Sequence, residues 1–267
     1  MQYRTLGRTG LEVSVVGFGG IPIKDVDRQS AVAIVKRAVD LGINHIHTSP
    51  TYGNSASKVG EAIEGRRDDC ILNVKIFGAK RSQTESQLRQ AFEDLRTDHL
   101  DIVQFRITEG KFEQGMGDQG GLQVIKRAQD EGTVDHIGIT DHHPEFLASA
   151  IESGEFSNLV VPFNYVYDGA RERLIPRAKE MDVGIVAMKT LGKGALTNVP
   201  EALNYVWGHG VPTAIVGVSS LEEVEEDASI GEEMEPLTRE QLKELDSRAE
   251  KLRAQYEVSN GALLPKG

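Results

Sequence analysis

The sequence predicts an α/β fold, a (β/α)8 TIM barrel with a β-hairpin before it and an extra helix after it. Short apolar runs alternate strictly with amphipathic stretches along the 267 residues, which is the pattern of a parallel sheet covered by helices. We count eight such pairs, whereas open doubly wound sheets more often have five or six strands. A single barrel also runs to about 250 residues, so we expect one domain over residues 1–267.

Each expected strand is a short apolar run of the kind that is buried on both faces of a parallel sheet. The runs cover residues 13–19, 43–47, 71–76, 100–105, 136–139, 159–162, 184–188 and 213–218. Each run is followed by a stretch with apolar residues at helical spacing. These expected helices cover residues 31–41, 55–64, 85–95, 121–130, 145–152, 170–181, 199–207 and 221–228.

Two further elements flank the barrel. Residues 3–13, where Gly7 and Gly10 stand among apolar and β-branched residues, predict a β-hairpin. Residues 237–256 predict a charged amphipathic helix. The longest connection, residues 108–120, contains four glycines and follows the fourth strand, on the face where barrel active sites lie. It is expected to be either a mobile lid or a disordered loop.

Composition narrows the function. A formal net charge of −11 makes nucleic acid and anionic membrane surfaces poor partners. There is no run of about 18 apolar residues, so no membrane-spanning helix is expected. The opening MQYRTLGRTG has no apolar signal core, which favours a cytoplasmic location. Cys70 is the only cysteine, and we interpret it as a buried core residue. We therefore expect a small-molecule substrate.

Polar side chains stand where the expected strands end, and in a parallel barrel these ends converge on one pocket. Lys75 is the only charged residue in the run 70–77, and Arg106 directly follows the run 100–105. Since barrel strands are covered on both faces, we interpret both cations as pocket residues. The other candidates are His45, His47, Gln104, Thr140, Asp141, His142 and Asn164, with Tyr52 in the loop after the second strand.

Several segments together resemble the aldo-keto reductases, in particular the shorter bacterial and archaeal members. They include YRTLGRTGLEVSVVGFGG, LGINHIHTSPTYGNSASKVGEAI and GIVAMKTLGKGAL, and the resemblance covers nearly the whole chain. It implies a (β/α)8 barrel that reduces carbonyls with NADPH or NADH as cofactor (NADP or NAD) and without a metal.

The resemblance also implies a catalytic tetrad, which this chain matches only in part. In the family a tyrosine donates the proton, a lysine lowers the pKa of the tyrosine, an aspartate pairs with the lysine, and a histidine orients the carbonyl. Tyr52 and Lys75 match. His47 stands at the aspartate position, and Arg106 stands at the histidine position.

These replacements change the expected charge of the pocket. Lys75 and Arg106 would share it without a carboxylate, which is costly unless an anionic ligand is bound. Arg106 is suited to grip a carboxylate, sulfonate or phosphate. Neighbouring positive charge favours deprotonated Tyr52 and disfavours charged Lys75. We therefore expect a substrate with an acidic group and a Tyr52 that acts more readily as a general base than as a general acid.

The cofactor positions implied by the resemblance have also changed. Thr140, Asp141 and Val160 stand where the family often has the serine, asparagine and glutamine that hold the nicotinamide amide. After the eighth strand, five carboxylates lie between Glu222 and Asp227, which argues against a tight clamp on an NADP 2′-phosphate. The expected cofactor-binding residues are Thr140, Asp141, Asn164, Lys189, Lys193, Gly217, Ser219 and Ser220.

Three hypotheses remain open. The first is a nicotinamide-dependent oxidoreductase in which Tyr52 relays the proton, Lys75 tunes it, and Arg106 with His47 binds or orients the substrate. The second is a cofactor-independent lyase, epimerase or isomerase that uses the same four residues. The third is a non-catalytic barrel that binds a small anion. A metal hydrolase built on His45, His47 and His142 is disfavoured, because the sequence offers no evident further ligand.

Overall fold

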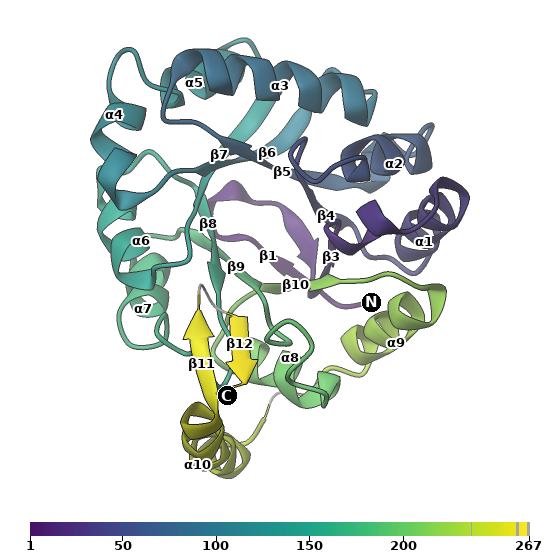
Figure 1. The fold of residues 1–267 in the computed structure, drawn as a ribbon, viewed down its shortest axis with the longest axis vertical. Helices are drawn as coiled ribbons and strands as arrows, with labels where there is room; N and C mark the ends of the chain where they lie inside the picture. The colour runs from purple at the N-terminus through teal and green to yellow at the C-terminus, as the bar shows by residue number, and fades with distance from the viewer. Residues whose placement is uncertain (236, 260–261, 266–267) are drawn as a thin grey trace.

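The strands form the predicted barrel (Figure 1). The computed structural model describes residues 1–235, 237–259 and 262–265. Within them, eight parallel strands close in the order β10-β3-β4-β5-β6-β7-β8-β9. Their bounds are Val16–Gly19 for β3, His45–Thr48 for β4, Ile71–Phe77 for β5, Leu100–Arg106 for β6, Val134–Thr140 for β7, Asn158–Pro162 for β8, Gly184–Met188 for β9 and Thr213–Gly217 for β10.

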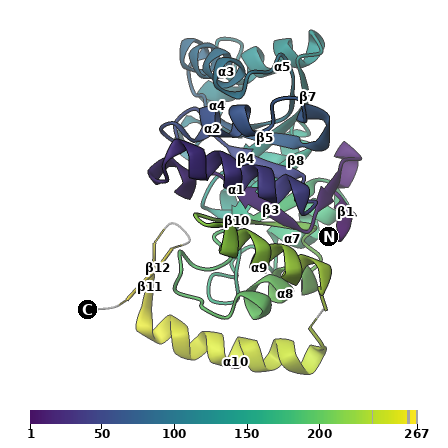
Figure 2. The same cartoon turned by 90° about the vertical axis from the view of Figure 1, so that its right-hand side faces the viewer.

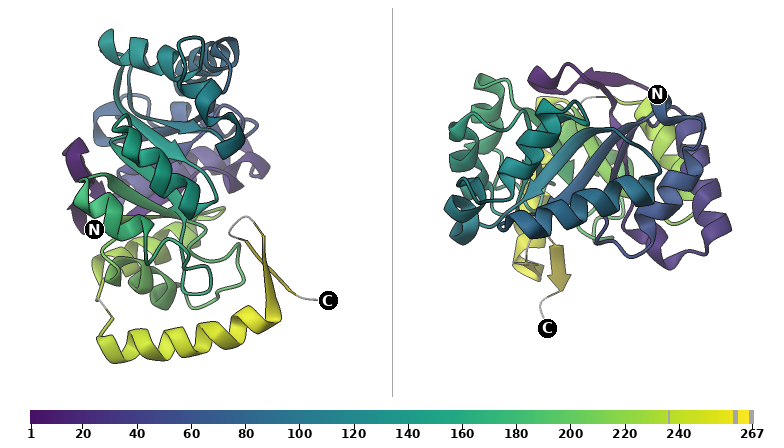
Figure 3. Two further views of the ribbon diagram at one scale, coloured as in Figure 1. Left: turned by 90° about the vertical axis from the view of Figure 1, so that its left-hand side faces the viewer. Right: turned by 90° about the horizontal axis from the view of Figure 1, so that it is seen from above.

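A ring of helices surrounds the barrel (Figures 1 and 3). Their apolar residues are buried against the strands, and polar caps start three of them: Asp27, Asn198 and Ser220 each accept a first-turn backbone N–H. The ring consists of α1 Arg28–Asp40, α2 Ser55–Ala62, α3 Arg81–Leu95, α5 Leu122–Asp130, α6 Pro144–Ala150, α7 Leu174–Glu180, α8 Val199–Gly208 and α9 Leu221–Glu232.

The predicted hairpin closes the N-terminal end of the barrel. Strands β1 Tyr3–Thr5 and β2 Glu12–Ser14 pair antiparallel, so the expected strand 13–19 is divided between β2 and β3. Leu6 and Val13 pack in one buried cluster with Ile102, Val160, Val186 and Ile215. Gly7 has a φ of +50°, and a Cβ there would overlap the backbone of Gly184, so this close approach requires glycine.

The predicted C-terminal helix is also present, as α10 Arg239–Gln255, and it lies outside α8 (Figure 2). Its buried Leu245 and Ala249 face the barrel. Arg248 forms a two-pronged ion pair with Glu201 at the start of α8, with N–O distances of 2.6 and 2.7 Å. Strands β11 Tyr256–Ser259 and β12 Ala262–Pro265 then form an antiparallel pair that the sequence analysis did not predict.

The glycine-rich connection 108–120 contains helical structure, so its interpretation as a disordered loop was wrong. A short 3-10 helix, Glu109–Lys111, leads into α4 Phe112–Met116. The Phe112 ring meets Phe146 of α6 edge to face, with the ring centroids 5.4 Å apart. A Cβ on Gly115 would lie 2.8 Å from Ile107 Cδ1. These apolar contacts, which the glycine content concealed, hold the segment against the barrel. No helix among the described residues is both long and apolar enough to cross a membrane.

Candidate active site

The four residues expected to carry catalysis come from neighbouring elements at the C-terminal end of the barrel. His47 lies on β4, Lys75 on β5 and Arg106 on β6, and Tyr52 follows β4. Lys75 Nζ lies 4.3 Å from the centroid of the Tyr52 ring. The His47 and Tyr52 rings are 6.2 Å apart. Since barrel strands deliver their last residues to one mouth, the gathering of these four residues is a direct result of the fold.

Arg106 has a counter-charge, contrary to the sequence-based expectation. Its Nη1 forms an ion pair with Asp141 Oδ2 and also donates to the carbonyl oxygens of Ile107 at 3.0 Å and Thr140 at 3.3 Å. The other Asp141 oxygen accepts from the backbone N–H of His143 at 2.9 Å and contacts His143 Nδ1 at 2.6 Å. Burial opposes ionisation of Asp141, but the hydrogen bonds from Arg106 and His143 outweigh it and lower the pKa of the carboxyl.

Asp141 was assigned to the cofactor, and its role as the partner of Arg106 was missed. Because β6 pairs with β7 with Arg106 opposite Thr140, the next residue, Asp141, comes beside the guanidinium. The sequence did contain a hint of this ion pair, since an arginine and an aspartate stand at the ends of consecutive strands. The strand register, which the sequence does not give, is what brings the two side chains together.

Several cations besides Arg106 lie around this mouth. Burial is the main reason that the pKa of Lys75 falls to about 8, and Arg106 and Lys189 add to the effect. Burial likewise lowers the pKa of Lys189 to about 8, with contributions from Lys193 and Arg106. Four cations therefore influence one another at this end of the barrel: Lys75, Arg106, Lys189 and Lys193. Asp141 is the carboxylate that pairs with Arg106.

Tyr52 keeps its proton in this setting. Burial raises the pKa of the phenol, and the opposing effect of Arg106 is smaller. The expectation that positive neighbours would make Tyr52 a ready general base was therefore wrong, because desolvation of the phenolate outweighs their attraction. A protonated phenol near a bound carbonyl is suited to general-acid catalysis.

His47 is uncharged. Burial lowers its pKa to about 3, and Lys75 and His45 contribute. Its Nε2 atom is buried without a hydrogen-bond partner. Neutral His47 cannot take over the charge of a carboxylate, which leaves Lys75 without a counter-ion at this position and agrees with its lowered pKa.

His45 belongs to the barrel interior. Its Nδ1 lies 3.3 Å from Thr213 Oγ1 and its Nε2 lies 3.0 Å from Asn73 Nδ2, so it links three strands. Among the described residues, the one metal-capable group of His, Cys, Asp or Glu consists of His99, Asp101 and Asp135. The ligand atoms of His45, His47 and His142 do not gather in this way, which gives the disfavoured metal hydrolase no support.

The residues expected to hold the nicotinamide amide are engaged with the backbone. Thr140 Oγ1 donates to the carbonyl oxygen of Val160 at 2.9 Å. Asn164 Oδ1 accepts from the N–H groups of Val166 and Tyr167, and its Nδ2 donates to the carbonyl oxygen of Lys189. Val160 is buried beside Leu6 in the cluster that closes the other end of the barrel.

The loops after β9 and β10 are the remaining expected cofactor segments. Lys189 and Lys193 both adopt left-handed backbone conformations, with φ of 56° and 61°. After β10, which ends at Gly217, Ser220 caps α9, and the Ser219 N–H and Oγ both donate to Glu223 Oε2 at 2.6 and 3.0 Å. This carboxylate lies where a phosphate would meet the helix start.

A hollow of about 390 Å³ lies between the starts of α1 and α9, lined by Gln29, Ser30, Ala33, Ile34, Ser219, Ser220, Leu221 and Glu222.

Comparisons with known proteins agree with this architecture. The sequence profile of the Aldo/keto reductase family matches residues 15–206. L-galactose dehydrogenase of Arabidopsis thaliana is 27% identical, over 90% of this chain and 91% of that protein. Pyridoxine 4-dehydrogenase of Escherichia coli (strain K12) is 31% identical, over 56% of this chain and 57% of that protein.

Solved structures share the fold. The holo form of an aldo-keto reductase from Bacillus halodurans has a TM-score of 0.82 and 22% identity, and the match covers 92% of this chain and 96% of that one. An aldo/keto reductase from Klebsiella pneumoniae in complex with NADP and acetate has a TM-score of 0.77 and 18% identity, over 93% of this chain and 96% of that one.

Proposed function

Since this chain belongs to the aldo/keto reductase family, an NAD(P)-dependent group of oxidoreductases, we propose that it interconverts a small carbonyl compound and its alcohol, and that this substrate carries an acidic group. The observation that carries the proposal is the Tyr52–Lys75 pair, with 4.3 Å between Nζ and the ring centroid, at the mouth of the family's barrel. His47 and Arg106 complete the proposed site.

The lysines after β9 fit a nicotinamide dinucleotide, whereas at the start of α9 Glu223 occupies the groups of Ser219. The phosphates of the dinucleotide are anions, and Lys189 and Lys193 share the cationic neighbourhood of Arg106. The hollow between α1 and α9 has the size of a small-ligand pocket. When bound, the cofactor supplies or accepts the hydride. We assign Lys189, Lys193, Gly217, Ser219 and Ser220 to its binding.

In the proposed mechanism, Tyr52 donates its proton to the substrate oxygen. The phenol is protonated and half-buried, and Lys75 stands over its ring, where a positive charge stabilises the phenolate that remains after proton transfer. Arg106 is fixed by Asp141 and two backbone carbonyls. It would orient the substrate carbonyl as the histidine of the family does, but with a permanent positive charge. His47 contributes a neutral ring beside Tyr52.

The acidic substrate is supported by the cations that gather at the mouth. Lys75 and Lys189 are both destabilised as cations by burial and by like charges. A ligand carboxylate among them would remove part of this cost. Asp141 offsets the charge of Arg106, so Lys75 and Lys189 would bind the acidic group together with Arg106.

The cofactor-independent alternative requires a general base, and no observation favours it. Tyr52 is held protonated, and His47, with a pKa of about 3, is a weak base. A non-catalytic anion-binding barrel would leave the Tyr52–Lys75 pair without a use.

The first test is titration of the purified protein with NADPH, NADH, NADP+ and NAD+, followed by fluorescence and calorimetry. We expect micromolar binding of at least one of them. Turnover would then be compared for carbonyl substrates in matched pairs, a carboxylic acid and its amide, with the acid favoured in kcat/KM. No binding at millimolar cofactor would refute the redox proposal. Equal turnover of acid and amide would refute only the acidic substrate.

A further inference from the structure

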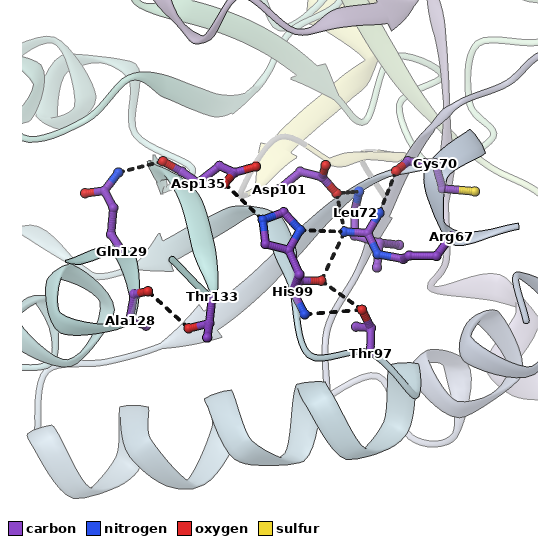
Figure 4. Close-up of polar contacts among 10 residues, drawn as sticks. All are labelled: Arg67, Cys70, Leu72, Thr97, His99, Asp101, Ala128, Gln129, Thr133 and Asp135. Atoms are coloured by element: carbon purple, nitrogen blue, oxygen red, sulfur yellow. Dashed lines mark hydrogen bonds and ion pairs between the residues drawn. The ribbon is translucent and has the colours of Figure 1, made fainter. Parts of the chain in front are cut away.

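Three side chains of the types that bind metals meet at the N-terminal ends of β6 and β7 (Figure 4). The Tyr52 mouth is at the other end of the barrel. His99 immediately precedes β6, Asp101 is its second residue, and Asp135 is the second residue of β7. One ligand atom from each lies within 4.8 Å of the other two. We propose that His99, Asp101 and Asp135 form a binding site for a divalent transition-metal ion, with Zn²⁺ as the ion of matching chemistry.

The strand register explains why these side chains gather. Leu100 pairs with Val134 and Ile102 pairs with His136, which sets Asp101 and Asp135 side by side on adjacent strands. Alternation along the chain places His99 on the same side as Asp101. Two neighbouring carboxylates repel each other unless a cation stands between them, so the geometry favours binding of a positive ion.

Arg67 supplies part of that charge and orients one ligand. Its Nη2 donates to Asp101 Oδ2 at 2.6 Å, and the Leu72 N–H donates to the same oxygen at 2.8 Å. Both bonds go to Oδ2, and Oδ1 is the oxygen that we assign to the metal. One guanidinium offsets one of the two carboxylates, which leaves a negative charge for an incoming ion. Buttressing of a ligand carboxylate in this way is typical of metal sites.

His99 is held in position by both ring nitrogens. Nε2 lies 2.9 Å from Asp135 Oδ1, and Nδ1 lies 3.4 Å from Arg67 Nη2. A metal bound at Nε2 would take the place of the ring proton shared with Asp135. The ring proton would then be on Nδ1, so the long contact with Arg67 would open, whereas the shorter bond from Arg67 to Asp101 would remain.

The donor set suits zinc. Imidazole nitrogen and carboxylate oxygen are both zinc ligands, and three protein ligands leave a fourth position for water. The His99, Asp101 and Asp135 side chains are 35%, 15% and 45% exposed, so an ion can reach the site from solvent. Residues at the N-terminal end of barrel strands serve stability more than chemistry. We therefore assign the ion a structural role in joining the starts of β6 and β7.

The test uses Co²⁺ as a coloured probe for zinc. The full chain, stripped with a chelator, is titrated with Co²⁺ and visible absorption is recorded, with Zn²⁺ as competitor. We expect saturation at one equivalent, loss of the signal in His99→Gln and Asp135→Asn, and retention in Asp98→Asn. The last variant is the matched control because it removes a carboxylate beside His99 that is not a ligand. No saturable signal at millimolar Co²⁺, or a signal that survives His99→Gln, would overturn the proposal.

A second measurement needs no variant, and therefore does not depend on the folding of one. Diethyl pyrocarbonate modifies accessible histidines, and mass spectrometry locates the products. Zn²⁺ should slow modification of His99 at least about tenfold and leave His143, whose side chain is 71% exposed, unchanged. Equal modification of His99 with and without Zn²⁺ would also overturn the proposal.

Discussion

Cations gather at the mouth of the barrel, whereas at the opposite end two carboxylates lie beside one guanidinium. Lys75 and Lys189 lie near Arg106, which is paired with Asp141. At the start of β6 and β7, Asp101 and Asp135 flank His99, and Arg67 binds one of them. An excess of like charge costs free energy unless a ligand offsets it. Under the two proposals made above, one barrel would present two ligand preferences: an anionic substrate and cofactor at one end, and a metal cation at the other.

Removal of the proposed proton donor should have the largest effect at the mouth. Tyr52→Phe deletes the hydroxyl but keeps the ring beside Lys75. We expect kcat to fall by about 10²–10⁴-fold, with unchanged thermal unfolding. The control is Tyr3→Phe. Tyr3 lies on the hairpin, outside the site, and its hydroxyl donates to the carbonyl oxygen of Gly42. Turnover that survives Tyr52→Phe would mean that another group carries the proton.

The Arg106–Asp141 pair can be broken to increase the excess of positive charge at the mouth. Asp141→Asn leaves a largely buried guanidinium without its carboxylate, since the Arg106 and Asp141 side chains are 16% and 1% exposed. We expect the free energy of unfolding to drop by about 3 kcal/mol, measured by chemical denaturation. Asp118→Asn, on the surface, should change it by less than about 0.5 kcal/mol. A similarly small change in Asp141→Asn would show that the ion pair is not needed for stability.

The closed end offers a test that involves no charge. Gly7→Ala places a Cβ against the backbone of Gly184 at a φ of +50°, whereas Gly10→Ala, at a φ of +70°, meets nothing within 4 Å. Both substitutions strain the backbone, but only the first also separates the hairpin from the barrel. We expect losses of unfolding free energy of about 3 and about 1 kcal/mol, measured by denaturation. Equal losses would show that the hairpin does not seal this end.

The pH dependence of ligand binding should show the smallest effect. Lys75 and Lys189 both have a pKa of about 8, so they are charged below pH 8 and lose their charge above it. The Kd of an acidic substrate should therefore rise several-fold as pH increases through 8, and that of its neutral amide should stay level. Calorimetric titration of both ligands gives the comparison. A parallel rise for both would separate the lysines from recognition of the acid.

Some features were readable from the sequence because they depend on local patterns. The apolar runs and helical spacings predicted the barrel, and the glycines around residues 7–10 predicted the hairpin. Lys75 and Tyr52 were identified because a charged residue in an apolar strand, and a tyrosine after a strand end, are unusual in themselves. Connection 108–120 was misread because its four glycines indicate flexibility, while the ring that Phe112 contacts, Phe146, lies far away in the chain.

By itself the sequence determined the order of strands and helices, the position of the mouth and the residue types that reach it, because periodicity and chain direction are local properties. The tertiary structure decided the electrostatics. It placed Asp141 beside Arg106, buried Tyr52 deeply enough to keep its proton, and brought Asp135 to Asp101 and His99. Charge interactions and desolvation depend on distances of a few ångströms between distant parts of the chain, and only the closed barrel with its register defines those distances.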